Sequence, residues 1–214
     1  MASLADDMGA DSSAIFAILR ADARIGSKAY LTPGLGFGGR CLPKDTVALE
    51  AMAVAAGHPL RLLEAATHVN RSRIPAVVGW LRESLGTLQD SRVFLGGLAF
   101  KPGTDDLRES PSVKLARALA AEGATIAAWD PVVRTKIADI SVFDQLEPAI
   151  TGADALVIGH AWAGWQDLDP ARVRRLARGR WVHDSARALP RSVWIEHGFM
   201  FHGPARRARQ SAAV

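Results

Sequence analysis

The segment from Arg40 to Asp45 contains the one cysteine of the chain and neighbours that could make it a nucleophile. Pro43 is typical of the first turn of a helix, so Cys41 is expected just before a helix N-terminus. The helix dipole and the ammonium group of Lys44 would both favour the thiolate form. Asp45 could orient a water molecule near the sulfur, or it could simply cap the helix. The pattern therefore indicates either a nucleophile that forms a covalent intermediate or a small buried residue.

Glycines precede this cysteine, and residues 34–39 (GLGFGG) satisfy the dinucleotide-binding pattern G-x-G-x-x-G. That pattern requires a buried strand before it. Here the segment from Tyr30 to Pro33 precedes the loop and a helix is expected after it, so we expect no NAD site in the loop. Its glycines would instead let a ligand approach the sulfur of Cys41 closely.

The composition narrows the class of protein. Hydrophobic residues make up 49% and charged residues 22% of the 214, which is typical of a globular chain. A single cysteine excludes an internal disulfide framework, and the histidines have no metal-ligand spacing, so no metal is expected. The net charge of +4 could indicate nucleic acid, but aromatic residues do not interleave with the basic ones, so no nucleic-acid partner is expected. Without an apolar run of membrane-spanning length or a signal peptide, we expect no membrane association and a cytoplasmic location.

The elements that must position the cysteine loop fall into two halves, of which the first is helical. Periodic apolar residues predict helices over residues 12–20, 43–56 and 60–85. Ser12 or Ser13 is the expected cap of the first, and Pro75 should kink the third or restart it near Ser72. Because this Ala-rich half has few ways to bury its own apolar stripe, we expect a homodimer formed through it.

The second half alternates short apolar runs with helices, which predicts an α/β fold with a parallel, Rossmann-like sheet. One connecting helix is especially clear, with Ser110 as its cap, Pro111 in its first turn and Gly123 at its end. We place the boundary near residues 86–90, which gives domains 1–88 and 89–214. The strands are predicted over residues 91–98, 124–130, 154–160 and 180–184.

Two long motifs resemble those of the UDP-glucose/GDP-mannose dehydrogenase family. The segment GFGGRCLPKD is similar to the cysteine motif of that family, which usually reads GFGGSC followed by two residues and KD. The segment FLGGLAFKPGTDDLRESPS, residues 94–112, resembles its C-terminal signature. The shorter matches follow the order of the family, so the resemblance covers essentially the whole chain; they are ADARIG (21–26), VNRSR (69–73) and AAWDP (127–131).

The resemblance implies a reaction. These enzymes oxidise the C6 alcohol of a nucleotide sugar to a carboxylate with two NAD molecules in succession. The cysteine, here Cys41, would attack the aldehyde to form a thiohemiacetal, a second hydride transfer would give a thioester, and water would hydrolyse it. The residue matching Asp45 would help to position that water. The expected ligand is a UDP- or GDP-linked sugar.

The resemblance also implies roles for other residues. The residue matching Arg24 would reach into the neighbouring subunit's site, and Arg108 would contact NAD across the domain cleft. From the residues alone, the segment around Arg108 is more simply a solvated loop. The remaining residues would contact the substrate; they are Tyr30, Gly34, Gly36, Gly38, Phe100 and Lys101.

The chain also departs from the family pattern. Arg40 replaces the small serine usually found before the cysteine, and Ala186 stands where a late substrate-binding arginine is expected, with Arg187 one position on. We find no strand followed by a G-x-G-x-x-G loop, so most of the NAD site is expected to be missing and the chain inactive alone. A separate NAD-binding chain is then a possible partner. The alternatives are a non-catalytic nucleotide-sugar binding or oligomerisation module and an enzyme that uses Cys41 without NAD.

Overall fold

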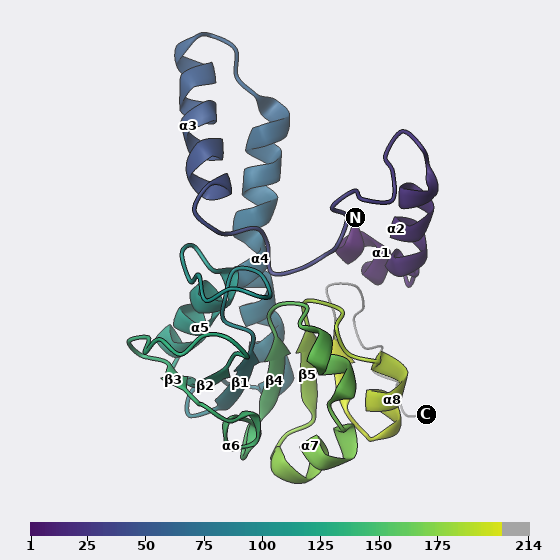
Figure 1. Cartoon of the computed structure of the whole chain (residues 1–214), viewed down its shortest axis with the longest axis vertical. Coiled ribbons are helices and arrows are strands. Elements are labelled where there is room, and N and C mark those ends of the chain that lie inside the picture. The colour runs from purple at the N-terminus through teal and green to yellow at the C-terminus, as the bar shows by residue number, and fades with distance from the viewer. Residues whose placement is uncertain (203–214) are drawn as a thin grey trace.

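The first half of the chain is helical, as predicted, in a computed structural model that describes residues 1–202 (Figure 1). The basic tail after Pro204 and the end of the predicted second domain lie outside the described residues. Helices α3 and α4 form a hairpin that projects from the rest of the molecule. The helices of this half are α1 (Ala2–Asp7), α2 (Ser12–Ala21), α3 (Leu42–Ala55) and α4 (Arg61–Leu85).

Helix α4 connects the hairpin to the sheet. It is one helix of 25 residues with Pro75 inside it, so the restart expected near Ser72 does not occur. Proline removes one helical hydrogen bond, but tertiary packing of the following turns can offset that loss. The second half of α4 supplies this packing, because Val77, Val78 and Leu81 are buried in the core of the sheet domain.

The second half is an α/β unit with a six-stranded, all-parallel sheet within residues 1–202, and the predicted fold class is confirmed. The strand order is β3-β2-β1-β4-β5-β6. Four strands match the predictions, whereas the short edge strands β3 and β6 were not predicted. The strands are β1 (Arg92–Gly96), β2 (Thr125–Trp129), β3 (Ser141–Val142), β4 (Ala155–Ile158), β5 (Trp181–Asp184) and β6 (Met200–His202).

Side chains of each central strand alternate between two apolar cores. Val93 and Leu95 on β1 pack on one face with the second half of α4 and with α5 (Pro111–Ala121). Phe94 points to the other face, which holds buried residues of α6 (Leu146–Ile150), α7 (Pro170–Leu176) and α8 (Arg191–Glu196). Burial on both faces explains why the strands read as continuous apolar runs.

Helix caps fix where two of these elements begin. The side chain of Ser110 accepts a hydrogen bond from the amide of Val113, which confirms it as the cap of α5. The cap of α2 is Asp11, whose carboxylate accepts from the amide of Ser13 at 2.8 Å, so the prediction of Ser12 or Ser13 as cap was wrong. The Asp11 carboxylate accepts the hydrogen bond from the backbone amide that a serine hydroxyl would otherwise accept. Both serine hydroxyls are therefore available for another partner.

Candidate functional site

Cys41 lies at the N-terminus of α3, where the sequence predicted it. It is the N-cap residue of the helix, its side chain makes no capping hydrogen bond, and the residue is exposed. Pro43 occupies the second helical position rather than the first. The backbone amide of Asp45 donates to the carbonyl oxygen of Cys41 at 2.8 Å, and the Asp45 carboxylate forms an ion pair with Lys44. The helix therefore presents the sulfur to solvent at its positive end.

The glycine loop before the cysteine is packed between two parts of the protein. A Cβ atom added to Gly36 would overlap the side-chain oxygen of Asn70 on α4. A Cβ atom added to Gly38 would overlap the carbonyl oxygen of Glu109 on the opposite side. The glycines at these positions therefore serve close approach of protein to protein, in a loop that no strand precedes.

The same packing joins the two motifs of the sequence analysis. The amide of Gly39 donates to the carbonyl oxygen of Arg108 at 3.1 Å, and the ring of Phe100 would lie 2.9 Å from a Cβ atom added to Gly39. The ammonium nitrogen of Lys101 lies 5.4 Å from the centroid of the Phe100 ring, within the range of a cation–π contact. The structure thus brings Cys41, the glycine loop and the 100–108 segment into one site.

The 100–108 segment has an internal ion pair. The guanidinium of Arg108 donates to both carboxylate oxygens of Asp106, at 2.8 Å and 2.6 Å. These hydrogen bonds, then the bond from the Arg108 amide, lower the pKa of Asp106 to about 2. Attraction from Arg40 contributes a smaller part of this shift. Lys44 and Arg108, each paired with a carboxylate, are the cations that interact with Cys41.

A buried carboxylate anchors the start of this segment. Asp130, at the end of β2, accepts hydrogen bonds from the amides of Leu98 and Ala99 at 2.7 Å and 3.2 Å and from the Nε2 atom of His160 at 3.0 Å. Burial alone would raise the pKa of Asp130, but these bonds and those from Val132 and Val133 outweigh it and hold the pKa well below its usual value. The carboxylate is therefore ionised and holds the chain as it leaves β1.

Three residues predicted to bind substrate lie outside this group of contacts. Arg24 forms an ion pair with Asp22 at 2.6 Å and its side chain is 89% exposed. Tyr30 is 96% exposed, so it packs on nothing in its own chain. The guanidinium of Arg187 donates to the hydroxyls of Ser13, at 2.8 Å, and Ser12, so this side chain holds the start of α2. The substrate roles of all three residues remain predictions.

Two residues that sequence reasoning missed hold the glycine loop from the other side. Asn70 exchanges two hydrogen bonds with the backbone of Phe37, and Arg73 donates from Nε to the carbonyl oxygen of Gly34 at 3.2 Å. Both residues lie in the VNRSR segment that matched the family. The motif was visible, but no spacing rule connects a helical Asn to a loop more than thirty residues earlier.

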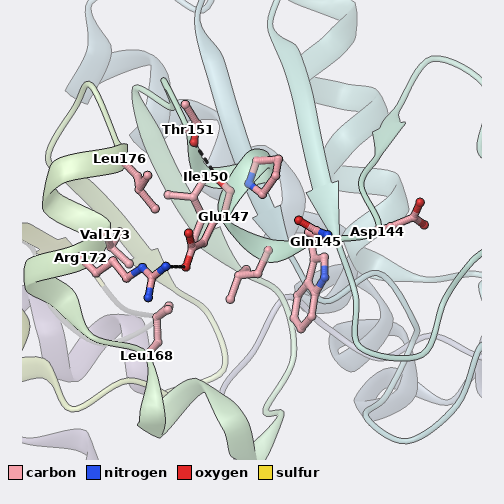
Figure 2. A pocket seen from close by; sticks show the side chains of 12 residues that line it. Asp144, Gln145, Glu147, Ile150, Thr151, Leu168, Arg172, Val173 and Leu176 are labelled. Carbon is pink, nitrogen blue, oxygen red and sulfur yellow. Dashed lines mark hydrogen bonds and ion pairs between the residues drawn. The ribbon is translucent and has the colours of Figure 1, made fainter.

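A cavity of about 790 Å³ lies elsewhere, between α6 and α7 (Figure 2). Its walls are mostly apolar, and they include an ion pair between Arg172 and Glu147, 2.6 Å apart. None of its lining residues belongs to the cysteine loop or to the 100–108 segment. It therefore adds nothing to the site around Cys41.

None of the helices within residues 1–202 combines the length and the apolarity needed to cross a membrane. In the same part of the chain, no three His, Cys, Asp or Glu side chains gather as a metal site would require.

Comparison with known proteins gives matches over most of the chain. Residues 1–72 match the central domain of the UDP-glucose/GDP-mannose dehydrogenase family, and residues 94–191 match the UDP binding domain of the same family. A UDP-glucose 6-dehydrogenase of Haloferax volcanii is 40% identical over 173 residues, which are 79% of this chain and 40% of that protein.

Solved structures agree with these matches. A UDP-glucose dehydrogenase from Pyrobaculum islandicum superposes with a TM-score of 0.81 at 30% identity, over 96% of this chain and 46% of that one. A UDP-D-ManNAc dehydrogenase from Pyrococcus horikoshii gives a TM-score of 0.82 at 27% identity, over the same shares of the two chains.

The chain thus spans about half the length of the relatives it matches. The resemblance inferred from the cysteine motif and the 94–112 segment is confirmed. The first lies within the matched central domain and the second within the matched UDP binding domain. This chain belongs to the UDP-glucose/GDP-mannose dehydrogenase family and carries the central and UDP-binding domains of that family.

Proposed function

We propose that this chain is the substrate-binding, cysteine-bearing part of an NAD-dependent nucleotide-sugar 6-dehydrogenase and is inactive by itself. The observation that carries the proposal is the junction of the two motifs: an exposed Cys41 at a helix N-terminus, next to a glycine loop that is bonded to the UDP-binding domain through Gly39 and Arg108. Because the loop contacts the UDP-binding domain, a ligand held by that domain would lie close to the sulfur of Cys41.

The surroundings of Cys41 suit a nucleophile. Hydrogen bonding to Asp45 raises the pKa of Lys44, and hydrogen bonding to Asp106 raises the pKa of Arg108. In both cases attraction to Cys41 makes a smaller contribution in the same direction. Two cations therefore lie near the sulfur, which stands exposed at a helix N-terminus where a ligand can reach it. Attack of the Cys41 sulfur on the carbonyl carbon of a C6 aldehyde would form a C–S bond while the carbonyl π bond opens onto oxygen, and transfer of the thiol proton to that oxygen would complete a thiohemiacetal. Asp45, in the first turn of α3, is the candidate to orient the water that later hydrolyses the thioester.

Other basic side chains near the glycine loop suit the substrate class. The relatives named above act on UDP-sugars by name, and a diphosphate carries negative charge that Lys101 and Arg40 can meet. The guanidinium of Arg187 faces Ser12 and Ser13 in the single chain, so its proposed contact with substrate requires those bonds to open.

The described residues do not fit an NAD site. Atoms of Asn70, Glu109 and Phe100 occupy the space beside the glycines of the loop, where the phosphates of a dinucleotide would have to lie. In addition, no strand precedes the loop. Arg108, proposed to contact NAD, already forms a bidentate ion pair with Asp106. Hydride acceptance is therefore assigned to an NAD-binding portion outside these two domains, whether in the same polypeptide or in a separate chain.

The helical half is proposed to form a homodimer. Helix α3 has no buried residue along its whole length, although its sequence, LPKDTVALEAMAVA, is largely apolar. Large side chains of both hairpin helices are exposed, including Met52 at 69% and Leu62 at 89%. Exposed apolar surface of this kind is typical of a face that another chain covers.

The test is NADH production by the purified chain with UDP-glucose or GDP-mannose, alone and with a separately supplied NAD-binding domain of a relative. Binding of each nucleotide sugar is measured in parallel by calorimetry. We expect binding by the chain alone, turnover only in the mixture, and loss of carboxylate product in Cys41→Ser. The variant should still bind the nucleotide sugar.

Other outcomes overturn the proposal in identifiable ways. Binding without turnover in either condition would indicate a nucleotide-sugar binding or oligomerisation module. Turnover by the chain without a nicotinamide cofactor would indicate different cysteine chemistry. Absence of nucleotide-sugar binding would contradict the proposed function as a whole.

A further inference from the structure

Asn70 makes a two-point contact with the peptide groups of the glycine loop. Its Oδ1 atom accepts from the amide of Phe37 at 2.7 Å, and its Nδ2 atom donates to the carbonyl oxygen of the same residue at 3.2 Å. Both backbone groups of one loop residue are therefore satisfied by one side chain. Phe37 lies in the middle of the loop, four residues before Cys41.

The contact requires an amide side chain of this length. An amide offers a donor and an acceptor on one short fork, whereas a carboxylate offers acceptors only and would face the Phe37 carbonyl oxygen without a proton to share. A Cβ atom on Gly36 would overlap the Oδ1 atom of Asn70, so the loop approaches as closely as glycine permits. Gly36 and Asn70 therefore form a matched pair.

A second attachment lies one turn further along α4. Arg73 donates to the carbonyl oxygen of Gly34, and residues three apart on a helix share a face. Loop residues 34 and 37 thus pair with helix residues 73 and 70, so the loop runs antiparallel to α4. Val77 and Leu81 of the same helix are buried in the core of the sheet domain. Helix α4 therefore fixes the position of the loop relative to the sheet.

We infer that Asn70 is a positioning residue for nucleotide-sugar binding, which rests on the function proposed above. It acts by fixing the backbone of Phe37, so that the loop and Cys41 are already in the binding conformation before the ligand arrives. With the loop held in advance, binding need not bear the conformational cost of ordering it. The residue itself touches the loop and not the reacting atoms.

The variants are Asn70→Leu, which removes both hydrogen bonds at similar volume, and Asn70→Asp, which keeps only the acceptor. The matched control is Ser72→Ala on the same helix, because the hydroxyl of exposed Ser72 bonds only the carbonyl oxygen of Val69 in its own helix. Three quantities are measured on the whole chain: hydrogen–deuterium exchange of residues 34–41 without ligand, the dissociation constant for UDP-glucose, and alkylation of Cys41 with and without UDP-glucose. Alkylation reports one position, since the chain has a single cysteine.

Asn70→Leu should speed exchange in the loop at least tenfold, weaken UDP-glucose binding by roughly tenfold and abolish ligand protection of Cys41. Asn70→Asp should fall between this variant and the unmodified chain, and Ser72→Ala should match the unmodified chain. The inference is overturned if loop exchange and affinity in Asn70→Leu stay within twofold of the unmodified chain. If the unmodified chain binds no nucleotide sugar, the proposed function fails, and slow loop exchange in Asn70→Leu would then also refute the positioning role.

Discussion

The backbone amide of Gly39 donates a hydrogen bond to the carbonyl oxygen of Arg108, with 3.1 Å between the two atoms. This bond joins the loop that ends in Cys41 to the loop that follows β1. It is possible only because neighbouring glycines lack side chains on the side that faces Glu109 and Phe100. The glycine-rich sequence is thus explained by contact between two domains of one chain before any ligand is considered.

Gly38 tests this account directly. Its backbone does not have a positive φ, but an added Cβ atom would overlap the carbonyl oxygen of Glu109 and contact Pro111. Because the obstacle is mainly backbone, Gly38→Ala should lower the free energy of unfolding by about 1–3 kcal/mol, as overpacking does elsewhere. Chemical denaturation of the purified variant measures this change.

Gly79 provides the matched control. It lies within α4, where nothing is within 4 Å of an added Cβ atom. Gly79→Ala should therefore leave stability unchanged or raise it by up to about 1 kcal/mol, through helix propensity and a less flexible unfolded chain. Equal effects of the two substitutions would show that the contact at Gly38 is not a constraint.

Arg187 gives a second test, because its backbone and side chain make opposite contributions. Its φ of 53° lies in the left-handed region, whereas its guanidinium donates to the hydroxyls of Ser12 and Ser13. Arg187→Ala and Arg187→Gly both remove the hydrogen bonds, and only the glycine variant relieves the backbone. We expect faster hydrogen exchange of α2 in both variants. The free energy of unfolding should be about 1 kcal/mol higher for Arg187→Gly than for Arg187→Ala. Unchanged exchange of α2 would mean that these bonds do not hold the helix.

The sequence predicted what depends on local patterns. The α/β class and the cap at Ser110 follow from apolar periodicity and capping chemistry, which act over a few residues. The placement of Cys41 at a helix N-terminus followed in the same way from Pro43. The missed edge strands β3 and β6 are only two and three residues long, too short to show a period.

The contacts that assemble the site could not be predicted in this way. Asn70 meets Phe37, and Asp130 meets Leu98, only because of how α4 and β2 pack against their neighbours. Tertiary packing also overrode a local rule at Pro75, where the helix continues. Asp130 illustrates the limit, because its carboxylate also accepts hydrogen bonds from the amides of Val132 and Val133 in the turn that follows β2.

His183 should make the chain sensitive to acid. It is buried at the end of the sheet, and its Nδ1 atom lies 2.8 Å from the Nδ1 atom of His202 on β6. Burial, together with the positive charge of His202 and of Arg73 on α4, lowers the pKa of His183 well below 6.5. Below pH 6.5 the unfolded chain therefore binds a proton that the folded chain does not. The free energy of unfolding should fall as the pH drops, by up to about 1.4 kcal/mol per pH unit.

The comparison variant is His183→Phe, which keeps an aromatic ring and removes the titrating group. Its stability should depend less on pH than that of the unmodified chain between about pH 7.5 and pH 5.5, where a histidine titrates. His58→Phe, at an exposed position, should leave the slope unchanged. Parallel curves for the unmodified chain and His183→Phe would contradict the assignment.

The exposed face of the α3–α4 hairpin yields the last prediction. Leu42, Val47, Met52 and Val54 on α3 are each about half exposed or more, and α3 buries none of its residues. If a second copy covers this face, Met52→Glu places a charge in an apolar interface, where burial of an unpaired carboxylate is strongly unfavourable. Sedimentation should show a dimer of the unmodified chain at micromolar concentrations, with an affinity weakened at least tenfold in Met52→Glu. Ile195→Glu, at a 45%-exposed position of α8 in the sheet domain, should sediment as the unmodified chain does. A monomer at all concentrations would assign the face to another partner, and the first to examine would be the NAD-binding portion, because it too must reach Cys41.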